Sequence, residues 1–406
     1  MKILVIDNVN YFDYPTGGIM SFYRSLLPAF GNDLRLAGIT IDNSIPVGKW
    51  SKREILGVTY DYFAMAKVTP NAKKPLIPER ITNCMHVKRY IKRIINGIDF
   101  DVILTQTPEV MYFIPEKYLS CTCNILPGVG SPIVISRYPW ARRFAKHYDR
   151  FFQMPKAAKA KWLLAAADKN ARQKFANRSN GLIQADQIIQ FPTRYDANIY
   201  YPYTKETRSA IRQNILHVKD TDPVFVTVGR LGWFKGWKLM IDAFRIVFNT
   251  QKSSKLFIIG DGEDDQKIQR YIAELKLQGH VILAGKKTPK EIAQYLNAAD
   301  TFIMGSMAEG WSTTLVEACA CGTPCVVTDF SSAREMTTDG VNGFVVQAYK
   351  LVGKERKLID GAIEVFADKM QQSLSMDRQK VIEYDQKFEK FATKYLKKDL
   401  LEILSH

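Results

Sequence analysis

Two glutamates flank a run of small polar residues in the last third of the chain. Residues 309–317 read EGWSTTLVE and follow an apolar run that ends at Met304. Ser312 is a good helix cap, so a helix is expected to begin after it, with backbone N–H groups in its first turn available to bind an anion. Glu317 then lies about one turn inside the helix, where its carboxylate can accept hydrogen bonds from a vicinal diol. Glu309 precedes the helix and can reach a sugar hydroxyl, although two surface glutamates beside an ordinary helix start give the same pattern.

Two cations follow another apolar run. Gly229-Arg230-Leu231 comes directly after residues 224–228, and Lys235-Gly236 follows. Arg230 offers a planar fork and Lys235 a point charge, which together suit a diphosphate. Gly229 and Gly236 permit close backbone approach. A solvated strand-to-helix loop is the alternative interpretation. Gly17-Gly18 also lies between an expected strand and helix, but it lacks the spacing of a dinucleotide-binding fingerprint.

Short β-branched runs alternate with helical patterns, which predicts parallel sheets covered by helices on both faces. The expected strands are 2–6, 34–41, 102–105, 123–126, 181–185, 224–228, 256–259, 281–284, 301–304 and 325–328. Beyond Lys350 the pattern is all-helical, including one helix over 386–404. The fold class predicted is α/β, with two doubly wound Rossmann-like domains facing a cleft and helices at the C-terminus. The expected divisions are an acceptor-side domain over 1–190, a linker over 191–204, a second domain over 205–375, and helices over 376–406 that pack back toward the first domain.

Composition excludes several classes of protein. The 406 residues are 46% apolar and 24% charged, which rules out a disordered or collagen-like chain. No apolar run is long enough to span a bilayer, and six cysteines without an export signal indicate a reduced, cytosolic protein. Three of these cysteines, Cys319, Cys321 and Cys325, fit packing better than zinc ligation. The acidic run 261–265 is expected to favour a helix start rather than bind a cation.

Taken in order, these motifs resemble glycosyltransferase family 4. The matching residues are Gly17-Gly18, Gly229-Arg230-Leu231, Lys235-Gly236, Gly260-Asp261-Gly262, Glu309 to Pro324, and Asp339 to Gly343. The resemblance covers roughly residues 222–348 in detail and implies the GT-B fold. It also implies a retaining transferase that moves a sugar from a nucleotide-sugar donor to a glycan or lipid-linked acceptor, in bacterial surface polysaccharide synthesis.

The resemblance implies a role for each matching position. Arg230 and Lys235 would hold the diphosphate, Glu309 would orient the donor sugar, and Glu317 would hold the ribose. The remaining donor-binding residues would be Gly17, Gly18, Gly229, Gly310, Trp311, Ser312, Thr313, Thr314, Leu315 and Lys286. No metal ion or cofactor is expected, because fixed cations and the helix start replace it.

One position departs from the family pattern. The family usually carries a histidine near the end of the apolar run 124–126, whereas this chain has Pro127 there. Two alternatives therefore stay open: a nucleotide-sugar epimerase of the same fold, or a catalytically degenerate module that only binds the nucleotide sugar.

The net charge of +16 is concentrated in the first half of the chain. Residues 1–190 hold 27 lysines and arginines against 14 acidic residues. This excess favours a polyanionic partner. No nucleic-acid recognition motif is present, so an anionic membrane surface is predicted, with the protein on its cytoplasmic side. The residues expected to face the membrane are Lys88, Arg89, Lys92, Arg93, Arg142, Arg143 and Lys146, with Trp140, Phe144, Phe151, Phe152 and Trp162 among the second basic run.

Overall fold

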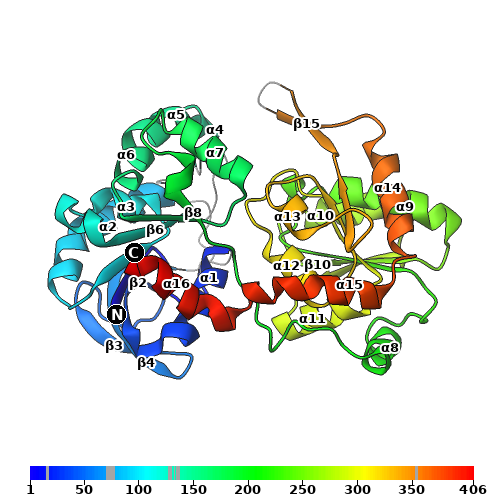
Figure 1. Ribbon diagram of the computed structural model, residues 1–406, viewed down its shortest axis with the longest axis horizontal. Helices are drawn as coiled ribbons and strands as arrows, with labels where there is room; N and C mark the ends of the chain where they lie inside the picture. The colour runs from blue at the N-terminus through cyan, green and yellow to red at the C-terminus, as the bar shows by residue number, and fades with distance from the viewer. Residues whose placement is uncertain (15–17, 70–77, 127–129, 132, 134–137, 353–354) are drawn as a thin grey trace. The chain divides into compact units, whose positions relative to one another are not determined.

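The computed structural model describes residues 1–14, 18–69, 78–126, 130–131, 133, 138–352 and 355–406. The chain divides into two compact units (Figure 1). Unit 1 consists of Met1–Pro192 together with Lys394–His406, and unit 2 consists of Thr193–Thr393. Each unit is built around a parallel sheet, as the alternating pattern of the sequence predicts.

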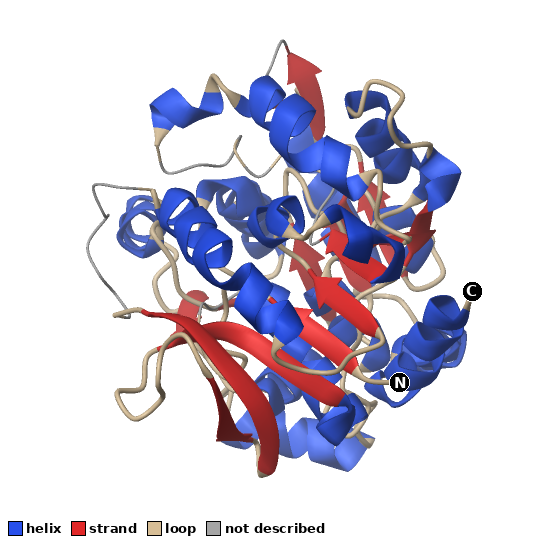
Figure 2. Ribbon diagram, turned by 90° about the vertical axis from the view of Figure 1, so that its left-hand side faces the viewer, coloured by secondary structure: helices blue, strands red, loops and turns tan. Residues whose placement is uncertain are grey.

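Unit 1 holds an eight-stranded sheet in the order β3-β4-β2-β1-β5-β6-β7-β8. All neighbouring strands run parallel except β3 and β4, which form an antiparallel edge. Figure 2 shows these strands between helices on both faces. The strands are β1 (Ile3–Ile6), β2 (Leu34–Thr40), β3 (Trp50–Ile55), β4 (Val58–Lys67), β5 (Val102–Thr105), β6 (Thr122–Leu126), β7 (Trp162–Ala165) and β8 (Ile188–Gln190). The helices are α1 (Gly18–Phe30), α2 (Glu79–Asn96), α3 (Pro108–Phe113), α4 (Pro139–Arg142), α5 (Ala145–Tyr148), α6 (Met154–Ala157), α7 (Lys169–Arg178) and α16 (Leu396–Ser405).

Unit 2 holds a six-stranded sheet in the order β11-β10-β9-β12-β13-β14, with every pairing parallel. Its strands are β9 (Val224–Val228), β10 (Lys255–Ile259), β11 (Val281–Gly285), β12 (Thr301–Met304), β13 (Cys325–Thr328) and β14 (Gly343–Val346). A separate hairpin joins β15 (Tyr349–Val352) to β16 (Glu355–Leu358). The helices are α8 (Lys205–Asn214), α9 (Trp237–Thr250), α10 (Asp265–Glu274), α11 (Pro289–Ala298), α12 (Thr313–Ala320), α13 (Ala333–Met336), α14 (Ala362–Ser373) and α15 (Arg378–Asp385).

Each sheet has a point at which its strand order reverses. In unit 1 the reversal lies between β1 and β5, and in unit 2 it lies between β9 and β12. In open α/β sheets, ligands bind at the carboxyl ends of the strands beside such a point. The predicted donor site is therefore expected at the connections that follow β9 and β12.

The C-terminal segment contributes to both units. Helix α15 contacts α12 in unit 2, whereas α16 buries Leu396, Leu400 and Leu404 in the core that contains Leu26 and Phe30 of α1. The buried face of α16 explains why the last helix is part of unit 1.

Three expectations about individual elements are wrong. Residues 181–185 form a turn rather than a strand, because Asn180 and Gly181 adopt φ of 54° and 82° after α7 ends. The region beyond Lys350 is not all-helical, because β15 and β16 form a hairpin. The helix expected over 386–404 is a 3-10 segment, η6 (Gln386–Phe391), followed by a break and then by η7 (Thr393–Tyr395), which leads into α16.

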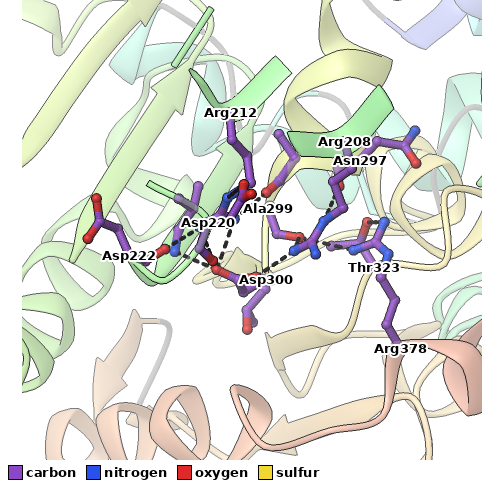
Figure 3. Close-up of polar contacts among 12 residues, drawn as sticks. Arg208, Arg212, Asp220, Asp222, Asn297, Ala299, Asp300, Thr323 and Arg378 are labelled. Carbon is purple, nitrogen blue, oxygen red and sulfur yellow. Dashed lines mark hydrogen bonds and ion pairs between the residues drawn. The ribbon is translucent and has the colours of Figure 1, made fainter. Parts of the chain in front are cut away.

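A buried arginine cluster fixes the amino ends of β9 and β12 (Figure 3). Arg212 is 1% exposed and donates to the Ala298 carbonyl at 2.7 Å, while Arg208 and Arg212 both pair with Asp300. Arg378 donates to the Ala299 carbonyl at 3.0 Å, and burial lowers the pKa of its guanidinium to about 10. These carbonyls lie at the negative end of α11, which stabilises the cations. The cluster therefore stabilises the sheet edge opposite the carboxyl ends of its strands.

Candidate functional site

Three loops of unit 2 meet at the carboxyl ends of β9, β10 and β12. A Cβ atom on Gly260 would lie 1.9 Å from the Gly229 carbonyl oxygen, and one on Gly236 would lie 1.9 Å from that of Gly305. Such distances are far below van der Waals contact, so only glycine permits this approach. The Leu231 amide also donates to the Asp261 carbonyl at 2.8 Å. The glycine motifs of the sequence therefore hold the three loops in direct backbone contact at the switch point.

Each of the two predicted phosphate-binding cations is paired with a carboxylate. Arg230 Nη2 lies 2.7 Å from Glu263 Oε2, and both side chains are about half exposed. Lys235 Nζ donates to Glu309 Oε1, which also accepts a hydrogen bond of 2.9 Å from Ser306 Oγ. The structure thus brings Lys235 and Glu309 together, and it places Arg230 on the loop that leads to them. Glu263, which sequence reasoning assigned only to a helix start, is the ion-pair partner of Arg230.

Helix α12 begins where the sequence predicts. Ser312 Oγ accepts a hydrogen bond of 3.2 Å from the Leu315 amide and so caps the helix. Thr313 and Thr314 are partly buried at its first turn, whereas Leu315 is fully buried and contributes its backbone only. The first N–H groups of a helix have no partner within it, so this end of α12 offers donors to an anion at the switch point.

Trp311 packs against the C-terminal segment of unit 2. Its ring lies 5.4 Å from that of Phe391 in an edge-to-face arrangement, and only 7% of the residue is exposed. Thr313 Oγ1 also lies within hydrogen-bond distance, 3.3 Å, of Thr193 Oγ1. The predicted donor-binding loop is therefore supported by residues more than 70 positions away, and Trp311 has a packing role that the sequence does not reveal.

Glu317 is partly buried one turn inside α12. Desolvation raises the pKa of its carboxyl to about 8, although a hydrogen bond from Tyr200 opposes the rise. Tyr200 comes from the segment between the two units' sheets and is 5% exposed. Sequence reasoning missed Tyr200. It lies in a stretch without helical or strand periodicity, and its partner Glu317 is more than a hundred residues later in the chain.

The remaining predicted donor-binding residues are placed differently. Gly310 lies in the loop before α12, and Lys286 is exposed just after β11, an edge strand separated from β9 by β10. Gly18 is the first residue of α1 in unit 1. Gly17 and Pro127 lie outside the described residues.

The cysteines and the acidic run make packing and pairing contacts. Cys319, Cys321 and Cys325 are at most 1% exposed, and Cys325 Sγ lies 3.1 Å from the Thr323 carbonyl. In the acidic run, Asp264 accepts hydrogen bonds from Trp237 Nε1 at 3.1 Å and from Lys267 at 2.6 Å. These contacts agree with the packing and helix-start interpretations of the two groups.

Most of the predicted membrane-facing residues lie on the surface of unit 1. Helix α2 buries Val87, Ile91, Ile94 and Ile95, and it exposes Lys88, Arg89, Lys92 and Arg93 on its other side. The second group lies over α4, α5 and the π-helical turn η3 (Asp149–Gln153). There Trp140, Phe144 and Phe151 are 54%, 57% and 63% exposed, beside the exposed Arg142, Arg143, Lys146 and Arg150. Two of the predicted aromatic residues pack against the protein instead. Trp162 is buried in β7, and the ring of Phe152 stacks on that of Tyr112 with the ring centroids 4.2 Å apart.

Comparison with known proteins agrees with this geometry. Residues 209–388 match the family described as Glycosyl transferases group 1. The lipopolysaccharide 1,6-galactosyltransferase of Salmonella typhimurium is 34% identical over 167 residues, which are 37% of this chain and 46% of that protein. The chain spans about half the length or less of the first curated relatives that it matches. The residues that match this family model lie within unit 2.

Solved structures resemble the whole chain at low sequence identity. Anabaena Alr3699/HepE in complex with UDP has a TM-score of 0.68 at 17% identity, and each chain is covered fully. Sucrose-phosphate synthase from Thermosynechococcus elongatus has a TM-score of 0.74 at 15% identity, over 100% of this chain and 98% of that one. The predicted α/β fold class, with two Rossmann-like domains of the GT-B type and C-terminal helices, is confirmed.

Proposed function

We propose that this chain is a retaining glycosyltransferase that moves a sugar from a nucleotide-sugar donor to a glycan or lipid-linked acceptor. The single observation that carries the proposal is the pairing of Lys235 with Glu309 just before the capped start of α12, at the switch point of unit 2, with Arg230 on the same loop as Lys235. A diphosphate needs cations and amide donors, and a donor sugar needs a carboxylate. All three kinds of group lie within loops that touch one another.

The proposed chemistry depends on charge at the leaving group. Departure of the nucleoside diphosphate breaks the bond between the anomeric carbon and the phosphate oxygen, and it leaves negative charge on that oxygen. Arg230, Lys235 and the first N–H groups of α12 stabilise this charge, because preorganised donors in a site are effective where charge develops. With fixed cations in these positions, the reaction requires no metal ion and no cofactor.

Retention of configuration follows from a front-face path in this proposal. The acceptor oxygen bonds to the anomeric carbon on the face that the phosphate leaves, and the acceptor proton passes to the departing phosphate oxygen. Glu309 orients the sugar and forms no covalent bond with it. A retaining glycosidase, by contrast, uses a carboxylate nucleophile about 5 Å from a second acid. Recovery of a glycosyl adduct on Glu309 would contradict the front-face path.

The comparisons support a uridine nucleotide and a surface-polymer acceptor. Anabaena Alr3699/HepE was solved with UDP, and the Salmonella relative is a lipopolysaccharide galactosyltransferase. We therefore propose a UDP-sugar donor and a growing bacterial surface polysaccharide, and we assign the acceptor to unit 1. Glu317 is proposed to hold the ribose through its vicinal hydroxyl groups.

A membrane contact of unit 1 completes the proposal. We define the basic aromatic patch as Trp140, Arg142, Arg143, Phe144, Lys146, Arg150 and Phe151. Exposed aromatic rings between cations are typical of segments that lie in a membrane interface, and anionic headgroups attract each cation by about 1 kcal/mol. Among the described helices, none is long and apolar enough to cross a bilayer. The proposal is reversible attachment to the cytoplasmic face, which would bring a lipid-linked acceptor to the enzyme.

A thermal-shift screen against nucleotide sugars tests this function. A ligand at 100 times its dissociation constant should stabilise the protein by about 2.7 kcal/mol. The stabilising donor is then incubated in the presence of EDTA, with and without acceptor, and the sugar is identified. Isomerised donor without acceptor would indicate an epimerase, whereas binding without turnover would indicate a degenerate module. No stabilisation by any nucleotide or nucleotide sugar would overturn the proposal.

A further inference from the structure

The turn over residues 339–343 carries a motif that the proposed donor site does not use. Asn342 in this turn is fully buried. Its Oδ1 accepts a hydrogen bond of 2.8 Å from the Thr338 amide. Its Nδ2 donates to the Met336 carbonyl at 2.8 Å and to Asp385 Oδ1 at 2.7 Å. The motif therefore ties the turn before β14 to the last residue of α15.

Asp385 is a buried carboxyl whose side-chain partner is Asn342. The residue is 4% exposed, and its Oδ2 has no hydrogen-bond partner among the residues that the structure describes. Burial raises the pKa of this carboxyl from an ordinary value of 3.8 to about 8, although the hydrogen bond from Asn342 opposes the rise. Asp385 therefore holds a proton at neutral pH. A carboxylate in this position would be desolvated with a single amide donor, which is a costly arrangement.

The titratable groups around Asp385 compensate a charge there only weakly. The groups that interact with it are Tyr384 and Lys387 on its own segment and Cys319 on α12. Lys387 is exposed and lies over the Tyr384 ring, 3.6 Å from its centroid. The turn contributes Asp339, which is exposed and of the wrong sign. An ionised Asp385 would thus be stabilised mainly by a solvated lysine, whose effect is screened.

The segment on either side of Asp385 contacts both ends of α12. At one end, Arg378 donates to the Cys321 carbonyl at 2.9 Å, just after the last residue of α12. At the other end, the ring of Phe391 packs edge-to-face on that of Trp311, which precedes the helix cap. Asp385 lies between these contacts, where α15 gives way to the 3-10 segment η6. Its hydrogen bond therefore fixes the joint that presents Phe391 to Trp311.

Close packing carries a displacement of this segment to the start of α12. A Cβ atom on Gly322 would lie 2.2 Å from Ile382 Cγ1, so α15 approaches the end of α12 closely. In η6, Phe388 is 3% exposed and its ring stacks on that of Phe391, with the centroids 6.1 Å apart. Interiors packed in this way transmit strain. A shift of η6 should therefore change the position of Trp311 and of the turn that follows it.

We propose that Asp385 is a positioning residue of the donor site, which, while its carboxyl carries a proton, holds η6 against Trp311 and keeps the amide donors at the start of α12 in place for a nucleoside diphosphate. A carboxylate gains hydration when the joint between α15 and η6 opens, and opening draws Phe391 away from Trp311. The closed joint keeps a proton, up to about pH 8, that the open joint loses. The closed joint therefore becomes less favoured as the pH rises. The identity of the ligand rests on the proposed function, whereas the pH-dependent joint does not.

Asp385→Asn tests the role of the proton, because its amide has the shape of a protonated carboxyl and cannot ionise. Calorimetric titration with UDP between about pH 6 and about pH 9 measures the affinity. At about pH 6 both proteins should bind UDP equally. Towards about pH 9 the wild-type Kd should rise at least about threefold more than that of Asp385→Asn, and by no more than about tenfold per pH unit, because one proton is coupled. Glu317 titrates in both proteins, so the difference between them reports Asp385.

Phe391→Ala tests the route to Trp311. Loss of the ring should raise the Kd for UDP at about pH 6 by at least about threefold, and the further rise towards about pH 9 should be no larger than in Asp385→Asn. The matched control is Asp360→Asn, an exposed acid of unit 2, which should follow the wild type at every pH. Should Asp385→Asn fail to fold, Phe391→Ala still tests the proposal, because Phe391 is only half-buried.

Three results would overturn the proposal. The first is an equal rise of the Kd with pH in the wild type and in Asp385→Asn. The second is weakened binding by Asp385→Asn at every pH, because the carboxyl would then act without its proton. The third is wild-type affinity in Phe391→Ala, because the joint would then not act through Trp311.

Hydrogen exchange without ligand separates this inference from the proposed function. At equal pH, amides within residues 386–393 should exchange faster in the wild type than in Asp385→Asn, and the ratio should grow between about pH 6 and about pH 8. If the ratio grows while no nucleotide binds, the transferase proposal fails and the pH-dependent joint stands. If UDP binds while exchange is the same in both proteins, the transferase proposal stands and the joint fails.

Discussion

The guanidinium of Arg230 is paired with the carboxylate of Glu263, at 2.7 Å. Both groups lie on loops that the glycine contacts hold together at the carboxyl edge of unit 2. A diphosphate that binds Arg230 would therefore approach a cation that already pairs with a carboxylate. The pair is about half exposed, so the cost of displacing it is small, but the carboxylate and the ligand compete for one cation.

Replacing Glu263 should therefore tighten nucleotide binding. Exposed ion pairs are worth about 0.2–1 kcal/mol, so Glu263→Gln should lower the dissociation constant for UDP by about 1.5- to 5-fold. Calorimetric titration of the wild type and the variant measures the change. Glu274→Gln, at the exposed end of α10, removes the same charge away from the loops and should leave the affinity unaltered. Weaker binding by Glu263→Gln would show that Glu263 supports the site instead of competing for it.

Removing the guanidinium itself should reduce turnover. Loss of one preorganised donor to developing charge costs about 3 kcal/mol, which is roughly a hundredfold in kcat. Because the Arg230 side chain is 58% exposed, Arg230→Ala should fold normally and melt close to the wild-type temperature. Steady-state release of UDP is the assay, with Arg245→Ala on the exposed side of α9 as the control. Near-normal kcat in Arg230→Ala would show that the site is assigned to the wrong residues.

The protonation of Glu317 should make stability depend on pH. Burial raises the pKa of this carboxyl from an ordinary value of 4.5 to about 8 in the folded protein. Between those values the folded state binds a proton that the unfolded state has lost, so stability falls as the pH rises from about 4.5 to 8. Asp385, whose pKa burial raises to about 8, contributes in the same direction.

Glu317→Gln should reduce the fall of the free energy of unfolding with rising pH, by at most about 1.4 kcal/mol per pH unit. Thermal unfolding at several pH values between 5 and 8 shows the slope, and Glu364→Gln on the exposed side of α14 controls for the loss of one acidic group. If stability falls with pH as steeply in Glu317→Gln as in the wild type, this carboxyl does not carry the raised pKa.

The sequence predicted the parts of the fold that depend on buried strands and capped helices. Residues 224–228, 301–304 and 325–328 are strands at the expected bounds, and α12 begins after Ser312 as its cap requires. Edge elements were missed or misplaced. Strand β3 is the partly exposed edge of the sheet in unit 1, and neither β3 nor its neighbour β4 was among the expected strands.

Contacts between distant residues lay beyond what the sequence could predict. Tyr200 hydrogen-bonds to Glu317, and Phe391 packs on Trp311. The two residues of each pair are far apart in the chain, so no local sequence pattern predicts the contact. Spacing can predict that cations and carboxylates follow neighbouring strands. It cannot predict that Arg230 pairs with Glu263 and Lys235 with Glu309, because those pairings depend on loop conformations set by the glycine contacts.

The basic aromatic patch should make unit 1 bind anionic membranes reversibly. Its exposed Trp140, Phe144 and Phe151 can enter the interface, while the cations between them meet lipid headgroups. We expect co-sedimentation with phosphatidylglycerol-containing vesicles at low salt, loss of binding at high salt because the charges are screened, and little binding to pure phosphatidylcholine.

Reversing the charge of Arg142, Arg143 and Lys146 to Glu should abolish this binding. At about 1 kcal/mol per cation, the partition coefficient at low salt should fall by at least about a hundredfold. A triple reversal of Lys205, Lys219 and Lys290 on unit 2 changes the net charge equally and is the matched control. Equal loss in both triple variants would indicate that net charge alone attracts the protein to the vesicle. Retention of binding by the Arg142, Arg143 and Lys146 variant, or a wild-type protein that stays in the supernatant at low salt, would show that the patch is an ordinary solvated surface.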